Sequence, residues 1–533
     1  MFNGKHISYW LDSAERTKFP SLKEDVAVDV AIIGGGIAGI TTAFILKNQG
    51  FKVALIEANR IVGDVTAGTT AKITTTSSLI YSNIKSNFGD KFALKFYKAN
   101  IDAFQTIQNI VKEFKIQCDY KMSPLYLYSS NEDSFYLIEN EYNSLNELGI
   151  PAQLTDDLPY PHKGLGILHE NQAEFHPKKY LNHLVDCIEG EGSFVFEKTK
   201  AINVEDVESK KNISIEDYDD IKIVHTNKGD LLANFVVIAT NSPIYDPDSV
   251  CNFMYQNKSY IMGIYTNKNN NSSMFVDVNP FHSYRTTNTE KGEMLIVGGE
   301  HHAVGEAKDT WECYKQLNNY IEDVFDTRDI EYFWSNQDNS TEDGVPLIGE
   351  TSHNGVYIAT GFGSWGMTTG TISANIISQL ILNKLDKNRI ETKIDEDLEI
   401  DEYINVFDPK RFKNKNSSKN IEKYVNSFKK DIINNFSNFK ELNEEESRLL
   451  SEYLLKLNYD EAKIVNIGNH SIAIYKDIDS NFYGVESKST HSGCTLVWNT
   501  AEKSWECPLF GSRFSFDGEV IHGPAVYNLK SYI

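Results

Sequence analysis

The chain has 533 residues, of which 41% are hydrophobic, and a formal net charge of −23 at neutral pH. Its length accommodates roughly two to four domains, and its apolar content is too high for a globally disordered chain. The acidic excess argues against nucleic acid and anionic membrane surfaces as partners, because both require basic patches on the protein.

Cysteine usage and the apolar runs bear on the cellular compartment. The six cysteines are sparse and scattered, which is typical of a reducing compartment rather than of a disulfide-stabilised scaffold. The N-terminal segment contains no apolar stretch of the kind that signal peptides carry. No apolar run approaches the roughly 20 residues that a bilayer-spanning helix requires. We therefore expect a cytoplasmic protein without a transmembrane segment.

A strand–turn–helix–strand pattern over residues 28–58 begins the first predicted domain. Its turn places Gly34, Gly36 and Gly39 at the spacing G-x-G-x-x-G. In such a turn the first glycine permits a tight bend, the second lets the backbone approach a pyrophosphate, and the third packs the helix on the strand. Glu57 ends the second strand, where a carboxylate accepts a hydrogen bond from a ribose hydroxyl. Because all these parts occur in order, the segment predicts a site for an adenine dinucleotide.

Further helices and strands follow in chain order. Apolar residues at three- and four-residue intervals predict a helix over 88–116. The other predicted helices cover 178–187 and 311–325, and the strands cover 126–128, 235–239, 293–298 and 356–360. The alternation of strand and helix near the N-terminus predicts a parallel sheet with helices on its faces. Charged and Asn-rich residues over 386–446 indicate a linker with exposed helices, and short strands after about residue 464 predict a small β-rich domain.

A second glycine-rich segment discriminates between dinucleotides. Residues 357–370 read YIATGFGSWGMTTG, a loop that begins a helix and can direct backbone N–H groups at an electron-rich ligand. Together with the first glycine turn, it resembles the flavin-dependent amine and amino-acid oxidoreductases of the D-amino-acid oxidase and glycine oxidase superfamily. The resemblance covers about residues 8–395. It implies FAD, because an enzyme that uses only NAD does not need the second glycine-rich loop.

The resemblance implies a fold and a set of cofactor contacts. The expected fold is an α/β FAD-binding domain of the Rossmann type (about 27–80, 160–245 and 335–395) with an α+β substrate domain (about 81–159 and 246–334). The residues expected to contact FAD come from the two glycine-rich turns, from the segment after the second strand and from the end of a later strand. They are Gly34, Gly36, Gly39, Glu57, Thr69, Thr70, Ala71, Ala239, Thr240, Gly361, Gly363, Gly366 and Met367.

The resemblance also implies a reaction. Enzymes of this superfamily remove a hydride from a carbon next to nitrogen, and flavin N5 accepts it. Tyr284 and Arg285 lie where such enzymes place substrate-facing residues, and Arg285 can bind a carboxylate in bidentate fashion. A surface arginine at the start of a hairpin explains the same residue equally well. Trp365, in the loop expected at the flavin ring, completes the candidate catalytic residues, and the implied partners are a small amine or amino acid and an unspecified electron acceptor.

The C-terminal segment 487–523 resembles a Rieske domain, which holds a [2Fe–2S] cluster between two loops with two Cys and two His ligands. The usual loops C-T-H-x-G-C and C-P-C-H-G-S read here as S-T-H-S-G-C and C-P-L-F-G-S. His491 and Cys507 match ligands, whereas Ser489 and Phe510 occupy the positions of the other two. A serine oxygen is a poor substitute for a thiolate, and phenylalanine cannot ligate iron.

The disulfide implied between the loops is also incomplete, since Cys494 matches one of its cysteines and Leu509 occupies the partner position. We therefore predict a small all-β Rieske-like domain (456–533) without cluster or metal, joined by a linker with helices (396–455) to the FAD-dependent oxidoreductase (1–395). Three hypotheses follow. The chain is an FAD-dependent amine or amino-acid oxidoreductase with a degenerate tail, an intact flavin and [2Fe–2S] electron-transfer enzyme with unusual ligands, or a non-enzymatic FAD-binding protein whose tail binds a partner.

Overall fold

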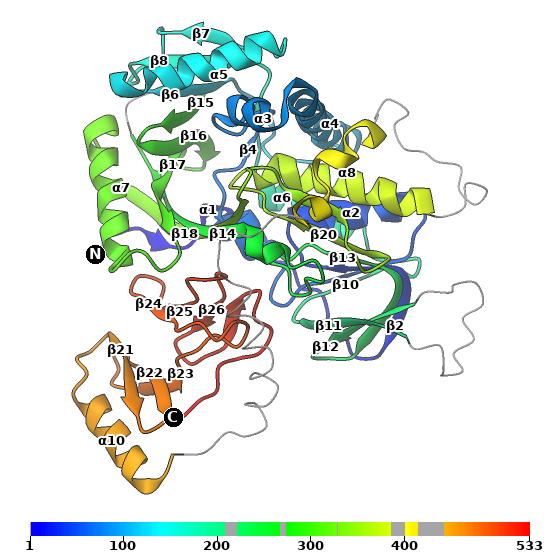
Figure 1. Cartoon of the computed structure of the whole chain (residues 1–533). Coiled ribbons are helices and arrows are strands. Elements are labelled where there is room, and N and C mark those ends of the chain that lie inside the picture. Colours follow the sequence, from blue (N-terminus) through cyan, green and yellow to red (C-terminus); the bar gives the residue numbers. More distant parts are fainter. Residues whose placement is uncertain (1, 208–220, 267–272, 328, 385–399, 414–441) are drawn as a thin grey trace.

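The computed structural model describes residues 2–207, 221–266, 273–327, 329–384, 400–413 and 442–533. Much of the predicted linker, residues 396–399 and 414–441, lies outside these ranges. The described residues form an α/β layer, a large mixed sheet with flanking helices, and a smaller β-rich unit that ends the chain (Figure 1).

The α/β layer is built on a sheet whose central strands are parallel. In order of pairing these are β3 (Val53–Ile56), β2 (Val26–Ile33), β13 (Asp230–Ile238) and β20 (Val356–Thr360). The first half of β13 also pairs antiparallel with β12 (Lys222–Thr226), so the sheet branches there. The remaining strands of this sheet are β10 (Phe194–Phe196), β11 (Ala201–Asp206) and β19 (Leu347–Glu350). β2, β3, β13 and β20 confirm the strands predicted at these positions.

The two faces of this sheet are covered differently. Helices α2 (Ile37–Asn48) and α8 (Gly366–Lys384) pack against each other and share a core with Val30 and Ile32 of β2. Side chains of β2 alternate between faces, and the intervening ones pack with residues of β11 and β12. Among the described residues, the apolar side chains of the antiparallel pair β11–β12 cover this second face. The prediction of helices on both faces is therefore wrong for it.

The second layer is a nine-stranded sheet. Its strands, in order of pairing, are β1 (Lys5–His6), β18 (Ile330–Thr341), β14 (Met254–Ile264), β17 (Gly292–Ala303), β16 (Phe281–Thr289), β15 (Met274–Val278), β6 (Leu125–Ser129), β8 (Leu165–His169) and β7 (Gln153–Thr155). Helix α7 (Thr310–Phe325) packs against β14 and β17, as Figure 1 shows. α7, β6 and β17 confirm the helix and the two strands predicted in this region.

The helix predicted over 88–116 is confirmed as α4 (Asp90–Glu113), and a separate helix that was not predicted precedes it. Helix α3 (Ile80–Phe88) ends and α4 (Asp90–Glu113) begins at Gly89, whose φ of +83° does not occur within a right-handed helix. The other elements of these two layers are α1 (Tyr9–Asp12), β4 (Lys72–Ile73), β5 (Lys121–Met122), α5 (Phe135–Glu147), β9 (Ala173–Glu174) and α6 (Pro177–Asp186). In the part of the chain that the structure describes, no helix is long and apolar enough to cross a bilayer.

The C-terminal unit contains one helix and two small sheets. Helix α10 (Glu444–Leu455) packs through Leu450 and Leu454 on the sheet of β21 (Glu461–Ile467), β22 (His470–Lys476) and β23 (Phe482–Glu486). The second sheet contains β24 (Val497–Asn499), β25 (Ser504–Glu506), β26 (Arg513–Ser515) and β27 (Val520–His522). A helix expected within the linker is thus part of the core of this unit.

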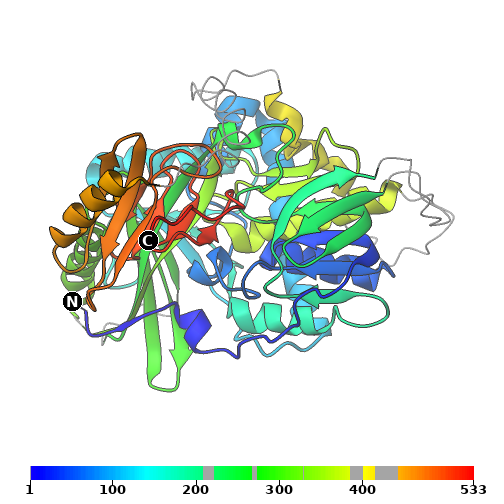
Figure 2. The same cartoon turned by 90° about the horizontal axis from the view of Figure 1, so that it is seen from below.

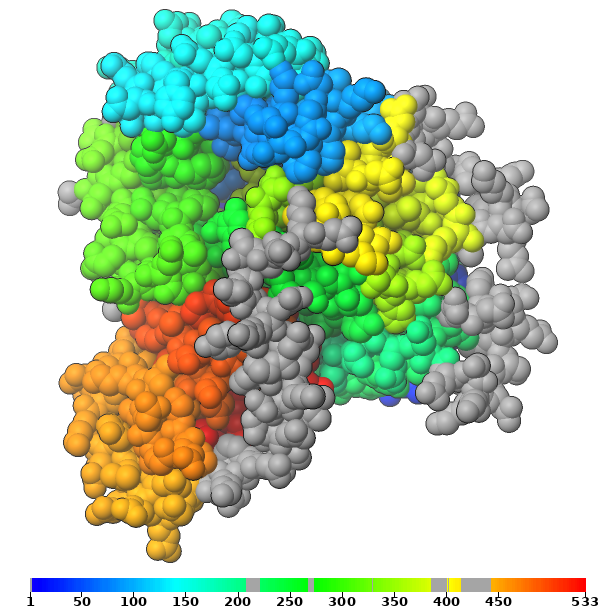
Figure 3. Space-filling model, in the orientation of Figure 1, coloured from blue at the N-terminus to red at the C-terminus, as the bar shows by residue number. Residues whose placement is uncertain are grey.

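The C-terminal unit is docked on the rest of the chain through buried contacts. Figure 2 and Figure 3 show its orange and red residues against the green residues of the large sheet. Lys258 of β14 forms a buried ion pair with Glu506 of β25, and Gln337 Nε2 donates a hydrogen bond of 2.7 Å to the carbonyl oxygen of Gly511. The Phe510 ring lies in an apolar cluster built largely by the other domain. Polar and apolar contacts therefore both fix the position of this unit.

Candidate functional site

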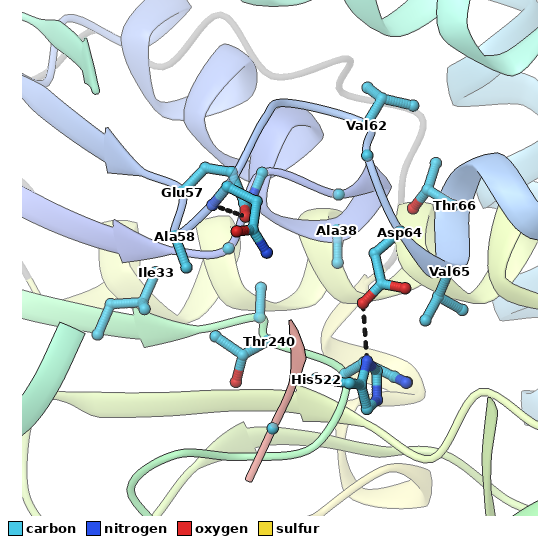
Figure 4. A pocket seen from close by; sticks show the side chains of 18 of the residues that line it. Ile33, Ala38, Glu57, Ala58, Val62, Asp64, Val65, Thr66, Thr240 and His522 are labelled. Atoms are coloured by element: carbon cyan, nitrogen blue, oxygen red, sulfur yellow. Dashed lines mark hydrogen bonds and ion pairs between the residues drawn. The ribbon is translucent and has the colours of Figure 1, made fainter. Parts of the chain in front are cut away.

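A cavity of about 580 Å³ lies where the carboxyl ends of β2, β3 and β13 meet the amino ends of α2 and α8 (Figure 4). Its wall combines the turn after β2, the segment after β3, the end of β13 and residues of the C-terminal unit. In open α/β sheets this edge is where ligands bind, and the volume suits a dinucleotide.

The turn after β2 has the geometry that its glycine spacing predicts. Gly34 has a φ of +116°, and a side chain there would clash with the carbonyl oxygen of Ala239. A side chain at Gly39 would clash with the carbonyl oxygen of Gly34, so α2 packs directly on the turn. Gly36 precedes α2 and provides no side-chain cap. The start of α2 therefore offers backbone N–H groups and the positive end of its dipole to an anion.

Glu57 is held at the end of β3 in the cavity wall (Figure 4). Its Oε2 accepts a hydrogen bond of 2.8 Å from the Gly35 N–H, and its Oε1 accepts one of 2.8 Å from the Asn59 N–H. Burial raises the pKa of Glu57, while these two bonds favour the carboxylate and act in the opposite direction. Each oxygen keeps a further lone pair, which a ribose hydroxyl can use.

The structure brings most of the predicted cofactor residues into one wall. Those that line the cavity are Gly34, Gly36, Glu57, Thr69, Ala239, Thr240, Gly366 and Met367. The others, Gly39, Thr70, Ala71, Gly361 and Gly363, do not line it. Gly39 acts through the packing of α2, and the Thr70 hydroxyl accepts a hydrogen bond from Lys72. Direct contact of these five residues with FAD stays a prediction.

Asp338 is a cavity residue that the sequence did not indicate. Its Oδ1 accepts a hydrogen bond of 2.8 Å from the Asn339 N–H, and its Oδ2 accepts one of 2.7 Å from the Ser364 N–H. Burial raises the pKa of Asp338 to about 6. Asp338 thereby connects β18 to the loop before α8. Asp338 and Ser364 are 26 residues apart in the chain, so no local sequence pattern relates them.

Tyr284 lies away from the cavity, whereas Trp365 stands between Ser364 and Gly366, which both line it. Tyr284 belongs to β16 and points into a separate apolar core, where its hydroxyl is 2.6 Å from the Tyr128 hydroxyl and 2.7 Å from His162 Nδ1. Trp365 directly precedes α8 and is partly buried against the main core. Neither residue lines the cavity. The position of Tyr284 in a separate core does not support its proposed catalytic role, and the role of Trp365 stays a prediction.

Arg285 follows Tyr284 on β16, so its side chain points to the opposite face of the sheet. It is 2% exposed, which excludes the interpretation as a surface arginine. Its Nη1 lies 3.3 Å from Glu174 Oε2, and its Nη2 donates a hydrogen bond of 3.0 Å to the carbonyl oxygen of Phe175. The guanidinium lies over the Trp10 ring, and its Nε has no hydrogen-bond partner among the described residues. Arg285 does not line the cavity itself.

Lys72, beside Arg285, is a second residue that the sequence reasoning missed. Its Nζ donates hydrogen bonds to Ser283 Oγ at 2.5 Å and to Thr70 Oγ1 at 3.1 Å. Burial and the nearby charge of Arg285 lower the pKa of Lys72 to about 7. Near neutral pH a large fraction of Lys72 is therefore a neutral amine that can accept a proton. In the sequence, the one indication of a role for Lys72 was its position directly after Thr69, Thr70 and Ala71, which were predicted to contact FAD.

The two loops that resemble cluster-binding loops lie together. The His491 ring meets the Phe510 ring edge-on with 5.1 Å between centroids, and Ser489 Oγ accepts a hydrogen bond of 3.3 Å from the His491 N–H. Ser492 Oγ is 3.4 Å from Cys507 Sγ. Within the described ranges, no group of three or more His, Cys, Asp or Glu side chains is arranged to hold a metal ion.

Both cysteines of these loops are free thiols. Hydrogen bonds from Cys494 and Ser492 lower the pKa of the Cys507 thiol. Leu509, at the position of the usual disulfide partner, contacts both the C-terminal core and the apolar cluster around Phe510. Apolar packing between the domains thus occupies the positions where the second loop usually carries a cysteine and a histidine.

Comparisons with known proteins agree with this geometry. The family described as FAD dependent oxidoreductase (DAO) matches residues 29–380, and the Rieske [2Fe-2S] domain family matches residues 452–533. YhfW of Bacillus subtilis (strain 168), which carries a provisional name as a Rieske 2Fe-2S iron-sulfur protein, is 31% identical over 528 residues. That alignment covers 98% of this chain and 97% of YhfW.

Two further proteins have names that refer to amine or amino-acid chemistry. Gamma-glutamylputrescine oxidoreductase of Escherichia coli (strain K12) is 23% identical over 247 residues, which are 45% of this chain and 55% of that protein. The crystal structure of glycine oxidase from Geobacillus kaustophilus has a TM-score of 0.54 at 16% identity, and it covers 68% of this chain and 96% of that one. The second likeness shows the fold alone. The chain therefore belongs to the DAO family of FAD-dependent oxidoreductases and carries a C-terminal Rieske domain in the same polypeptide.

Proposed function

We propose that the chain oxidises the carbon–nitrogen bond of a small amine or amino acid and passes the hydride to FAD. The observation that carries this proposal is the single cavity in which both glycine-rich segments meet, with Gly34 and Gly36 on one part of the wall and Gly366 and Met367 on another. The family match supports it, as does the relative named for γ-glutamylputrescine.

The residues of the wall fit FAD. The start of α2 would hold the diphosphate, Glu57 would hold a ribose, and the start of α8 at Gly366 would lie toward the flavin. FAD supplies the two-electron acceptor when it is bound. Glu57 and Asp338 are fixed by backbone N–H groups, so the polar part of the wall is in place before the cofactor arrives.

Arg285 and Lys72 are the proposed substrate residues. The guanidinium would bind a substrate carboxylate in exchange for its 3.3 Å contact with Glu174. Neutral Lys72 would accept a proton from the substrate ammonium, because the amine must lose this proton before it can give up a hydride.

Exchange of Arg285 for Met is then expected to raise KM about 30-fold for amino acids. Simple amines, which lack the carboxylate, serve as the matched control and should keep their KM.

Anaerobic reduction tests the enzymatic proposal directly. The purified protein is mixed with a panel of amines and amino acids in the absence of oxygen, and its visible flavin absorbance is followed. A substrate should bleach the flavin, and oxygen, a quinone or a soluble carrier added afterwards identifies the acceptor that restores the colour. Failure of every compound in a broad panel to bleach a bound flavin would contradict the proposal and favour a non-enzymatic flavoprotein.

We further propose that the Rieske domain holds no [2Fe–2S] cluster. Ser489 and Phe510 replace two ligands, and Phe510 is buried in an apolar cluster rather than directed at iron. Metal analysis and electron spin resonance of the purified protein test this. About two irons per chain with a Rieske signal would overturn it and establish the intact electron-transfer alternative, which the domain match favours. The cytoplasmic location stays a prediction.

A further inference from the structure

We propose that His522 of the Rieske domain is a direct ligand of FAD, so that cofactor binding and docking of this domain stabilise each other. The inference rests on the FAD assignment above. It goes beyond that assignment because it gives the C-terminal domain a function that requires no iron–sulfur cluster.

The C-terminal domain closes one side of the dinucleotide cavity. The wall includes Arg513 of β26 together with residues of β27 and the loop after it. These are Val520, Ile521, His522, Gly523 and Ala525. Figure 4 shows His522 next to Asp64 of the FAD-binding layer, within the same cavity as Glu57 and Thr240. A ligand that fills this cavity therefore contacts both domains.

His522 combines a fixed orientation with an unused polar atom. The residue is 5% exposed, and its Nδ1 lies 2.7 Å from Asp64 Oδ2, which fixes the plane of the imidazole. Its Nε2 is buried and has no hydrogen-bond partner in the described part of the chain. Buried polar atoms without partners are rare because their desolvation is not compensated. A ligand in the cavity is the natural source of the missing partner.

The neighbours of His522 indicate which ligand this is. Its partner Asp64 is two residues before Thr66 in the chain. Thr66 Oγ1 in turn accepts a hydrogen bond of 3.1 Å from the Ile37 N–H at the start of α2. The start of α2 is the place where the diphosphate of a dinucleotide binds. His522 is thus brought to the part of the cavity where FAD presents phosphate and sugar oxygens. Either kind of oxygen can form a hydrogen bond with an imidazole nitrogen.

Coupling between the cofactor and the domain follows from this arrangement. The domain is held by contacts that do not involve FAD, including the Lys258–Glu506 ion pair and the burial of Phe510. FAD adds a contact that exists only when the domain is docked. A ligand that binds the docked state preferentially stabilises that state, and docking raises the affinity for the ligand to the same extent.

Flavin titration of the full-length protein tests the proposal. FAD is removed, and its rebinding is measured by flavin fluorescence for the wild type, for His522→Leu and for His522→Gln. Loss of one hydrogen bond in a buried site should raise the Kd of His522→Leu about tenfold, and the Gln amide should recover part of the loss. His470→Leu is the matched control, since His470 lies on β22 of the same domain and does not line the cavity.

Hydrogen exchange of β27 gives a readout independent of affinity and of activity. FAD should slow exchange there in the wild type and in His470→Leu, and should do so less in His522→Leu. An unchanged Kd in a folded His522→Leu protein, with full protection by FAD, would overturn the inference. A wild-type protein that binds no FAD at all would instead refute the cofactor assignment on which it rests, so the two failures are distinct.

Discussion

At Gly34 the backbone itself lines the cavity proposed for FAD. Its φ of +116° is strained for any residue with a side chain, and a Cβ atom would clash with the carbonyl oxygen of Ala239 on the neighbouring strand. Both penalties act at the turn before α2, where we propose that the diphosphate binds. We therefore expect a small change at this residue to affect FAD binding as well as stability.

The change Gly34→Ala is expected to abolish FAD retention, because the turn can admit a methyl group only by moving away from β13. Gly50→Ala is the matched control, since Gly50 has a φ of +88° but nothing within 4 Å of the added Cβ. The control should cost about 1 kcal/mol of folding free energy and leave the flavin in place. The ratio of flavin to protein absorbance after dialysis measures the difference, and equal ratios in the two variants would contradict the argument.

Lys72 makes folding depend on pH. Its pKa is about 7 in the folded protein, against an ordinary value of 10.5. Between these values the unfolded chain binds a proton that the folded chain lacks, so stability rises with pH across this window. The loss of stability is complete below about pH 7 and is on the order of 5 kcal/mol.

Lys72→Met removes the titrating group and keeps a side chain of similar length. The variant should be more stable than the wild type near pH 6.5, and this advantage should shrink toward pH 10. Urea unfolding of the flavin-loaded protein across this range measures both free energies. A difference between variant and wild type that does not change with pH would show that Lys72 keeps its ordinary pKa.

Among the elements, the second loop of the Rieske domain contributes to packing between domains. Phe510 and Leu509 occupy positions where the resemblance implies a histidine and a cysteine, and both contact the apolar cluster that contains Phe253 and Met254. The loop is also held by a hydrogen bond from the Gly511 N–H to the Cys507 carbonyl oxygen at 2.8 Å. The same residues that disfavour iron therefore favour docking.

Phe510→Ala should weaken docking of the whole C-terminal domain. Removal of a buried ring costs about 3–5 kcal/mol when the cavity does not collapse. Leu455→Ala is the control, because Leu455 is an apolar residue of the same domain that is 76% exposed. Hydrogen exchange of β26 and β27 should increase in Phe510→Ala only. If both variants exchange like the wild type, Phe510 does not hold the domain in place.

In the whole molecule, one buried ion pair joins the two domains. The Lys258 and Glu506 side chains are 0% and 3% exposed, and Asn499 Nδ2 donates a further hydrogen bond of 2.7 Å to Glu506. Such a pair is shielded from salt, and removal of Lys258 leaves the buried Glu506 carboxylate with Arg513 Nε, 3.3 Å away, as its remaining cationic neighbour. Because the pair lies at the interface, separation of the domains would break it.

Lys258→Met is therefore expected to lower the free energy of unfolding by about 3 kcal/mol, at low and at high salt alike. Lys315→Met provides the contrast. Lys315 pairs with Glu312 on the surface, where both side chains are 57% exposed, so its loss should cost less than about 1 kcal/mol and depend on salt. Similar costs for the two variants would mean that the interdomain pair is hydrated.

Local patterns predicted the elements that hold the cofactor. The spacing of Gly34, Gly36 and Gly39 and the acid Glu57 are all within one βαβ unit, so geometry follows from sequence there. The spacing did not reveal Asp338 or Lys72, because their partners come from distant parts of the chain. The helix over 88–116 was predicted from its apolar periodicity and matches α4, whereas α3, which ends at Phe88, was not predicted.

By itself the sequence determined the dinucleotide turn, the family and the replacement of two cluster ligands, because each depends on residue type and on short spacing. The tertiary structure decided which side chains share a space. It placed Tyr284 in a separate core and Arg285 against Glu174, since neighbours on a strand point to opposite faces. It also brought His522 to the wall of the FAD cavity next to Asp64, 458 residues away in the chain. Such a contact forms only when one folded domain docks on another, so no local sequence pattern predicts it.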